Sequence, residues 1–220
     1  MFDFFSPEKL QQYAILAPGL LMALVCHEVA HGYVAYLLGD PTAKSQGRLT
    51  LNPIRHLDPI GTLAFFFVHF GWAKPVPVNP GYFKDPRKGM LLTALAGPGI
   101  NFLLAAAFAT VIHILISIEF TTGGMAEKII VPLYLISQAA VFVNLILGVF
   151  NLIPIPPLDG SNVLAYFLPR QLAYKYMSLS RYGFIILIGI IIAGQYTGVS
   201  LVGRIILPTV QAMTRLLGLN

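Results

Sequence analysis

Residues 13–38 read YAILAPGLLMALVCHEVAHGYVAYLL, an apolar run that carries His27, Glu28 and His31 in its second half. The run exceeds the roughly 20 apolar residues that a helix needs to cross a bilayer. Histidines four residues apart lie on one face of a helix, so His27 and His31 can bind the same metal ion, with Glu28 beside them. Because ionisable groups in hydrocarbon are costly unless they are paired or metal-bound, this stretch predicts a functional site at membrane depth.

The composition is that of an integral membrane protein. Of the 220 residues, 56% are hydrophobic and only 10% are charged, whereas soluble domains average about 25% charged residues. In such a protein the net charge of +5 marks cytoplasmic loops, and we expect no nucleic-acid partner. We also expect no removable signal peptide, because no short apolar segment with a cleavage site precedes residue 13.

Hydropathy predicts an α-helical polytopic fold with about four transmembrane helices. Between the first two, residues 47–80 are rich in proline and glycine and alternate apolar with polar positions, which predicts one or two small β-hairpins near the membrane face. A short apolar stretch, residues 61–72, is too short to cross alone. The predicted spans are residues 13–38, 89–118, 129–150 and 182–207.

Lysine and arginine gather between the first and second spans and between the third and fourth. The positive-inside rule then places both termini outside and both basic regions in the cytoplasm. We therefore expect a multi-pass protein of a prokaryotic cell membrane, with its site towards the cytoplasmic side.

A catalytic zinc ion needs a third protein ligand and an open position. Asp159 is the best candidate, in the sequence NLIPIPPLDG at residues 151–160. Its prolines must break the helix, and non-helical backbone at membrane depth is tolerated where it lines a wet cavity. Asp58 is a reserve candidate.

Four motifs together resemble the site-2 protease family of intramembrane zinc metalloproteases. They are the HExxH at residues 27–31, the NxxPxxPLDG at residues 151–160, and the stretches GWAKPVPVN at residues 71–79 and AGPGIN at residues 96–101. The resemblance covers about residues 13–165. One departure is Ser161, where many members of the family carry a second glycine.

The resemblance implies a zinc endopeptidase that hydrolyses transmembrane or membrane-adjacent protein segments. It implies one Zn²⁺ per chain, with His27, His31 and Asp159 as ligands. It further implies Glu28 as the general base and Asn151 as a residue that holds the substrate or the oxyanion. We expect a single membrane-embedded domain over residues 1–220, with a catalytic core at about 13–165 and an additional helix at about 182–207.

Other interpretations remain open at this point. The glycines of residues 96–101 predict close helix approach, and Asn144 predicts an interhelical hydrogen bond. The edge strands expected in residues 47–80 could bind an extended substrate by strand addition. The alternative function is an ion or proton transporter or channel that uses the His/Glu/Asp cluster. Transport gives no reason for the zinc-type spacing, and a catalytically inert metal scaffold would not need Glu28.

Overall fold

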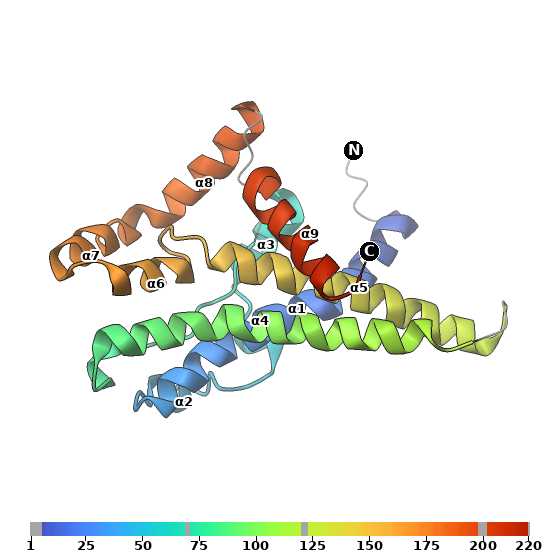
Figure 1. Ribbon diagram of the computed structural model, residues 1–220, viewed down its shortest axis with the longest axis horizontal. Coiled ribbons are helices and arrows are strands. Elements are labelled where there is room, and N and C mark those ends of the chain that lie inside the picture. The colour runs from blue at the N-terminus through green and yellow to red at the C-terminus, as the bar shows by residue number, and fades with distance from the viewer. Residues whose placement is uncertain (1–5, 69–70, 120–122, 198–201, 220) are drawn as a thin grey trace.

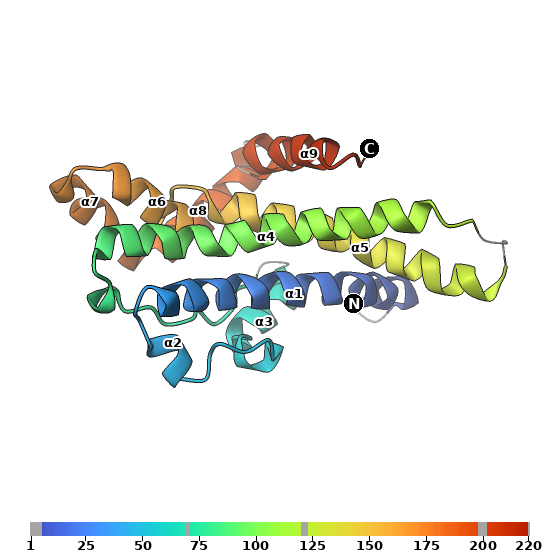
Figure 2. The ribbon, with the colours of Figure 1, turned by 60° about the horizontal axis from the view of Figure 1, so that its bottom comes forward.

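The computed structural model describes residues 6–68, 71–119, 123–197 and 202–219, and helices dominate them (Figure 1). Three long helices pack against one another and run roughly along the long axis of the molecule in Figure 2, while Figure 1 shows the first of them crossing obliquely behind the second. These three are the helices of the described ranges that are long and apolar enough to cross a membrane. They are α1 (Pro7–Leu37), α4 (Pro86–Ile116) and α5 (Met125–Asn151). The chain is thus a helical membrane protein, as predicted.

Two of the three long helices, α1 and α4, begin at side chains that satisfy free backbone donors. Ser6 Oγ accepts a hydrogen bond from the backbone N–H of Lys9 at the start of α1. Asp85 accepts from the N–H groups of Arg87 and Lys88 at the start of α4. Oxygen acceptors at this position are typical of helix starts. They fix where these two helices enter the bundle.

Shorter elements lie on both sides of the bundle. In Figure 2, α2 and α3 lie below α1, whereas α6, α7 and α9 lie on the opposite side, beyond α4. The short elements are α2 (Thr42–Ser45), η1 (Pro53–Arg55), α3 (Pro59–Val68), η2 (Pro80–Tyr82), α6 (Asp159–Phe167), α7 (Arg170–Met177), α8 (Ser180–Thr197), the π-helix η3 (Val202–Ile206) and α9 (Leu207–Leu216).

The hydrophobic core lies mainly between α4 and α5 and is closed by the C-terminal elements. Small side chains of α4 let α5 approach closely, and α9 packs against the same cluster. Association of helices in lipid depends on such close packing, because lipid tails are as apolar as the helices themselves. The buried cluster includes Ala105, Ala109, Ile112, Val141, Leu145, Leu187, Ile206 and Val210.

Two sequence predictions about the fold are not supported. The predicted fourth span, residues 182–207, corresponds to α8 and the separate elements η3 and α9, and residues 198–201 lie outside the described residues. The described part of the chain therefore contains three membrane-length helices instead of four. Of the apolar stretch 61–72, residues 61–68 belong to α3 and residues 69–70 are not described.

The predicted β-hairpins were wrong. In the described part of residues 47–80 the pairing is limited to one isolated antiparallel bridge, between Leu57 and Ala73. The physical reason is proline: Pro75, Pro77 and Pro80 have no N–H to donate to a ladder. Alternation of residue types predicted strands, but Pro75 and Pro77 leave donors on only one edge of this segment.

Candidate metal centre

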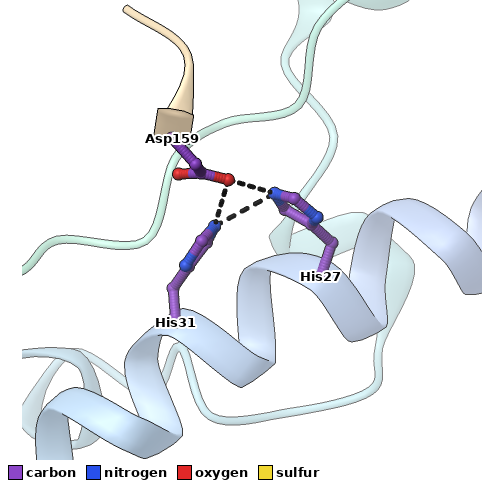
Figure 3. A group of neighbouring side chains, drawn as sticks. All are labelled: His27, His31 and Asp159. Atoms are coloured by element: carbon purple, nitrogen blue, oxygen red, sulfur yellow. Dashed lines mark hydrogen bonds and ion pairs between the residues drawn. The ribbon is translucent and has the colours of Figure 1, made fainter. Parts of the chain in front are cut away.

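Helix α1 brings His27 and His31 together, one turn apart and largely buried, at 5% and 9% exposure. Their Nε2 atoms face each other at 3.0 Å, and the two rings are nearly perpendicular (Figure 3). This is the geometry that the four-residue spacing predicts.

Asp159 approaches the pair from a different element. It is the first residue of α6, which starts after the turns that follow α5. Its Oδ2 atom lies 3.1 Å from His27 Nε2 and 3.2 Å from His31 Nε2 (Figure 3). The three side chains form the group of the described residues that could hold a metal ion, with their ligand atoms all within 4.8 Å of one another.

Gly160 allows α6 to start so close to the preceding turn. A Cβ atom at residue 160 would lie 2.1 Å from the carbonyl oxygen of Leu152 and 2.6 Å from that of Ile153. No side chain can occupy that space without moving α6. At the other end of α6, Arg87 Nη2 donates hydrogen bonds to the carbonyls of Ala165, Tyr166 and Leu168. Both contacts hold the helix that carries Asp159.

The Nδ1 atoms of the two histidines each face a hydrogen-bond acceptor. His31 Nδ1 lies 2.7 Å from the carbonyl oxygen of Thr93, and His27 Nδ1 lies 2.6 Å from Asn101 Oδ1. An oxygen of either kind can only accept, so each Nδ1 must carry the ring proton. In the neutral form of both rings, the two Nε2 atoms then present lone pairs to one another.

This arrangement fits a metal ion. Two Nε2 lone pairs and a carboxylate oxygen converge, and Asp159 Oδ2 is buried with no hydrogen-bond donor. Three acceptors at such distances repel each other unless a cation lies among them. Two imidazole nitrogens and one carboxylate oxygen are ligands that zinc takes in catalytic sites, where its fourth position stays open.

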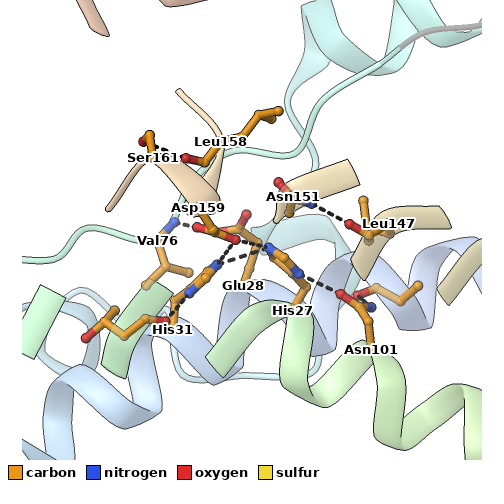
Figure 4. Close-up of polar contacts among 12 residues, drawn as sticks. His27, Glu28, His31, Val76, Asn101, Leu147, Asn151, Leu158, Asp159 and Ser161 are labelled. Atoms are coloured by element: carbon orange, nitrogen blue, oxygen red, sulfur yellow. Dashed lines mark hydrogen bonds and ion pairs between the residues drawn. The ribbon is translucent and has the colours of Figure 1, made fainter. Parts of the chain in front are cut away.

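Glu28 lies beside this centre on α1 and is half-buried. Its Oε2 atom accepts a hydrogen bond of 2.8 Å from the backbone N–H of Val76 (Figure 4). The carboxylate is thereby held next to the metal-ligand candidates by a segment that the sequence analysis did not connect to it. Sequence spacing gave no signal for that contact, which joins residues 48 positions apart.

Val76 belongs to an extended segment, residues 73–79, which we call the strap. Arg48 Nη2 donates to the carbonyl of Lys74, and the N–H of Asn79 donates to Asp40 Oδ2. Because the N–H of Val76 is bonded to Glu28, while Pro75 and Pro77 have none, residues 75–77 offer no free donor to an added strand. Substrate binding by strand addition along residues 47–80 stays a prediction, and these three residues do not supply donors for it while Val76 is bonded to Glu28.

Asp40 fixes the far end of the strap to the end of α1, and its side chain is fully buried. Burial alone would raise its pKa, but hydrogen bonds from the Thr42 hydroxyl and from the N–H groups of Asn79 and Thr42 outweigh it. They hold the pKa of the Asp40 carboxyl below its ordinary value.

Asn151 is the last residue of α5 and is partly buried. Its Nδ2 atom donates to the carbonyl of Leu147 in its own helix, at 3.0 Å (Figure 4). Among the described residues, no hydrogen bond or ion pair joins it to the His27–His31–Asp159 group. Asp58, the reserve ligand, accepts from the N–H of Gly61 and is not a member of that group.

Sequence analysis missed one functional face of α4. Thr93, Gly97 and Asn101 recur at four-residue intervals and all face the two histidines. A Cβ atom at residue 97 would lie 2.5 Å from His31 Nε2 and 2.6 Å from His27 Cε1. The signal was present in the sequence, as a glycine and an asparagine one turn apart in an apolar helix.

A histidine–carboxylate group that could hold a metal ion, beside a glutamate on a membrane-length helix, is the arrangement expected of a membrane-embedded metallopeptidase. Comparison with known proteins agrees. Residues 115–193, which include Asp159, match the model of peptidase family M50.

Curated relatives extend the match over most of the chain. "Putative zinc metalloprotease YwhC" of Bacillus subtilis (strain 168) is 40% identical over 188 residues, or 83% of this chain and 81% of that protein. "Zinc metalloprotease MJ0392" of Methanocaldococcus jannaschii is 28% identical over 162 residues, or 74% of this chain and 37% of that protein. No solved structure matches the chain. The chain belongs to peptidase family M50, the site-2 protease family of intramembrane zinc metalloproteases, as its motifs predicted.

Proposed function

We propose that this chain is a zinc endopeptidase that cleaves transmembrane or membrane-adjacent protein segments, with His27, His31 and Asp159 as zinc ligands. Glu28 is the general base and Asn151 an oxyanion donor. The observation that carries the proposal is the convergence of three lone-pair donors, with Asp159 Oδ2 at 3.1 Å and 3.2 Å from the two imidazoles. Family membership supports the same reaction.

Zinc, when bound, supplies Lewis acidity that activates water for attack near neutral pH and polarises a peptide carbonyl. Glu28 takes the proton of the attacking water and later delivers it to the leaving amine. To accept that proton, the Glu28 carboxylate gives up its hydrogen bond from the N–H of Val76 and accepts one from the water instead. The strap therefore holds the base in place before the substrate arrives.

Asn151 acts in the same reaction through its amide N–H₂. That group now donates to the carbonyl of Leu147, a bond within its own helix that costs little to exchange. Turned towards the centre, it supplies a donor where negative charge develops on the carbonyl oxygen of the substrate.

We further propose that the active site faces the cytoplasmic half of a bacterial plasma membrane. Lys44, Arg48 and Lys84 lie between α1 and α4, and Arg170 and Lys175 follow α6, whereas the residues between α4 and α5 are not enriched in basic side chains. His27 then lies about 15 Å from the cytoplasmic end of α1, at 1.5 Å per residue. The chain acts as one domain, with its catalytic core at about residues 13–165.

The decisive test compares wild type with Glu28→Gln in metal content and in cleavage of a model transmembrane substrate. We expect one zinc per chain in both proteins, because Glu28 is not a ligand, and a rate at least about 10²-fold lower in the variant. Glu8→Gln is the matched control, since Glu8 is an exposed glutamate in the first turn of the same helix. Equal cleavage by wild type and Glu28→Gln would refute the mechanism.

A further inference from the structure

Two buried amides on different helices form a chain of hydrogen bonds that ends at His27. Asn101 in α4 and Asn144 in α5 are both 0% exposed. Asn101 Oδ1 faces His27 Nδ1 at 2.6 Å, and Asn101 Nδ2 donates to Asn144 Oδ1 at 2.9 Å. Figure 4 shows Asn101 pointing from α4 at the imidazole of His27.

Backbone carbonyls fix the direction of this chain. Asn101 Nδ2 also donates to the carbonyl of Ala23 at 3.2 Å, and Asn144 Nδ2 donates to the carbonyl of Ala140 at 2.8 Å. A carbonyl oxygen can only accept, so the amide atom beside each must be the N–H₂ group. The oxygen of Asn144 is therefore turned to Asn101, and the oxygen of Asn101 is turned to His27.

The consequence reaches the metal-binding atom. An oxygen that can only accept requires the proton of His27 on Nδ1, which leaves Nε2 with its lone pair directed at His31 and Asp159. Metal-binding histidines generally depend on such a partner for their tautomer and ring orientation. We propose that Asn101, oriented by Asn144, is a positioning residue that sets His27 for metal binding.

Ordinary packing does not account for this arrangement. Interhelical hydrogen bonds in membrane proteins are weak on average, and a leucine pair would fill the same space without polar groups to satisfy. Here each amide is bonded through both its oxygen and its nitrogen, so neither buried amide has an atom without a partner. The proposal rests on the proposed function, since it concerns the same metal centre.

The test measures zinc affinity by competition with a chelating dye, in Asn101→Leu, Asn144→Leu and Ser137→Ala. Ser137 is a buried polar residue of α5 outside this chain of hydrogen bonds, and its variant is the control. We expect affinity about 10- to 100-fold weaker in Asn101→Leu. Asn144→Leu should lose less, because Asn101 keeps the carbonyl of Ala23, and Ser137→Ala should match wild type.

A second readout separates positioning from packing and needs neither zinc nor activity. NMR of zinc-free protein with isotope-labelled histidine reports which ring nitrogen carries the proton. His27 should hold it on Nδ1 in wild type and move it towards Nε2 in Asn101→Leu, while His31, bonded to Thr93, should not change.

Unchanged zinc affinity in Asn101→Leu, or an unchanged His27 tautomer, would overturn the proposal. Should Asn101→Leu fail to fold, Asn144→Leu decides, and affinity equal to that of wild type would then refute it. Failure of the proposed function would give a different result. Zinc affinities and histidine tautomers would then be as expected, but the wild-type protein would cleave no peptide.

Discussion

Substitution of Gly97 by alanine should weaken metal binding without disturbing the rest of the bundle. Gly97 lies on α4 directly against both imidazoles, so a methyl group there would lie 2.5 Å from His31 Nε2 and Cε1 and 2.6 Å from His27 Cε1. Ordinary contact begins at 3.4 Å. Each ring must therefore withdraw by about 0.9 Å, which far exceeds the roughly 0.2 Å tolerance of metal–ligand distances.

The size of the effect follows from which state bears the strain. Without metal, the rings can turn away from the methyl group, whereas three ligands on one ion cannot separate. Overpacking of this kind costs about 1–3 kcal/mol, and if the metal-bound state bears all of it, zinc affinity falls by roughly 5- to 150-fold. Peptide cleavage at saturating zinc should fall by about 10²-fold, since a misplacement of 1 Å has that effect on catalysis.

The assay is zinc competition with a chelating dye, together with thermal unfolding of zinc-free protein. Gly99→Ala is the matched control, because a Cβ at Gly99, on the same helix, meets nothing within 4 Å. Replacing glycine by alanine stabilises the helix by about 1 kcal/mol in both variants, so the comparison between them removes that contribution. If Gly97→Ala binds zinc as tightly as Gly99→Ala does, the imidazoles do not rest on this glycine in the metal-bound state, and the reasoning fails.

Two further predictions concern the supports of the centre. Asp40→Asn should destabilise the protein at neutral pH. Because hydrogen bonds hold the pKa of Asp40 below its ordinary value, this stabilisation is complete above the unfolded pKa of about 4 and is lost as the pH falls through the folded pKa. The difference in melting temperature between wild type and Asp40→Asn should thus shrink below about pH 4, and a constant difference would contradict it. Arg87→Met should release the end of α6 from α4, at a cost of about 1.5–3 kcal/mol for hydrogen bonds from a charged group. Lys88→Met, an exposed neighbour, is the control in thermal unfolding, and equal melting temperatures would contradict the role of Arg87.

The sequence by itself determined the membrane class, the family and the identity of the candidate ligands. Membrane-length apolar runs and a four-residue histidine spacing are local properties, because helix geometry fixes them without reference to the rest of the chain. The same holds for the helix break before Asp159, which the prolines at residues 154, 156 and 157 impose. What these patterns could not give was a count of spans, since the described part of the predicted fourth span consists of α8, η3 and the first residue of α9, and none of these is among the membrane-length helices.

Only the tertiary structure decided how the parts meet. The hydrogen bond of Val76 to Glu28, the contact of Gly97 with the two histidines and the amide pair Asn101–Asn144 join residues that are 43 to 70 positions apart. The strap also shows why alternation misled: Pro75 and Pro77 leave donors on only one edge of this segment, and there the N–H of Val76 donates to Glu28 instead of to a neighbouring strand. Hydrogen bonds between distant segments depend on the relative placement of whole helices, which packing sets and residue spacing does not encode.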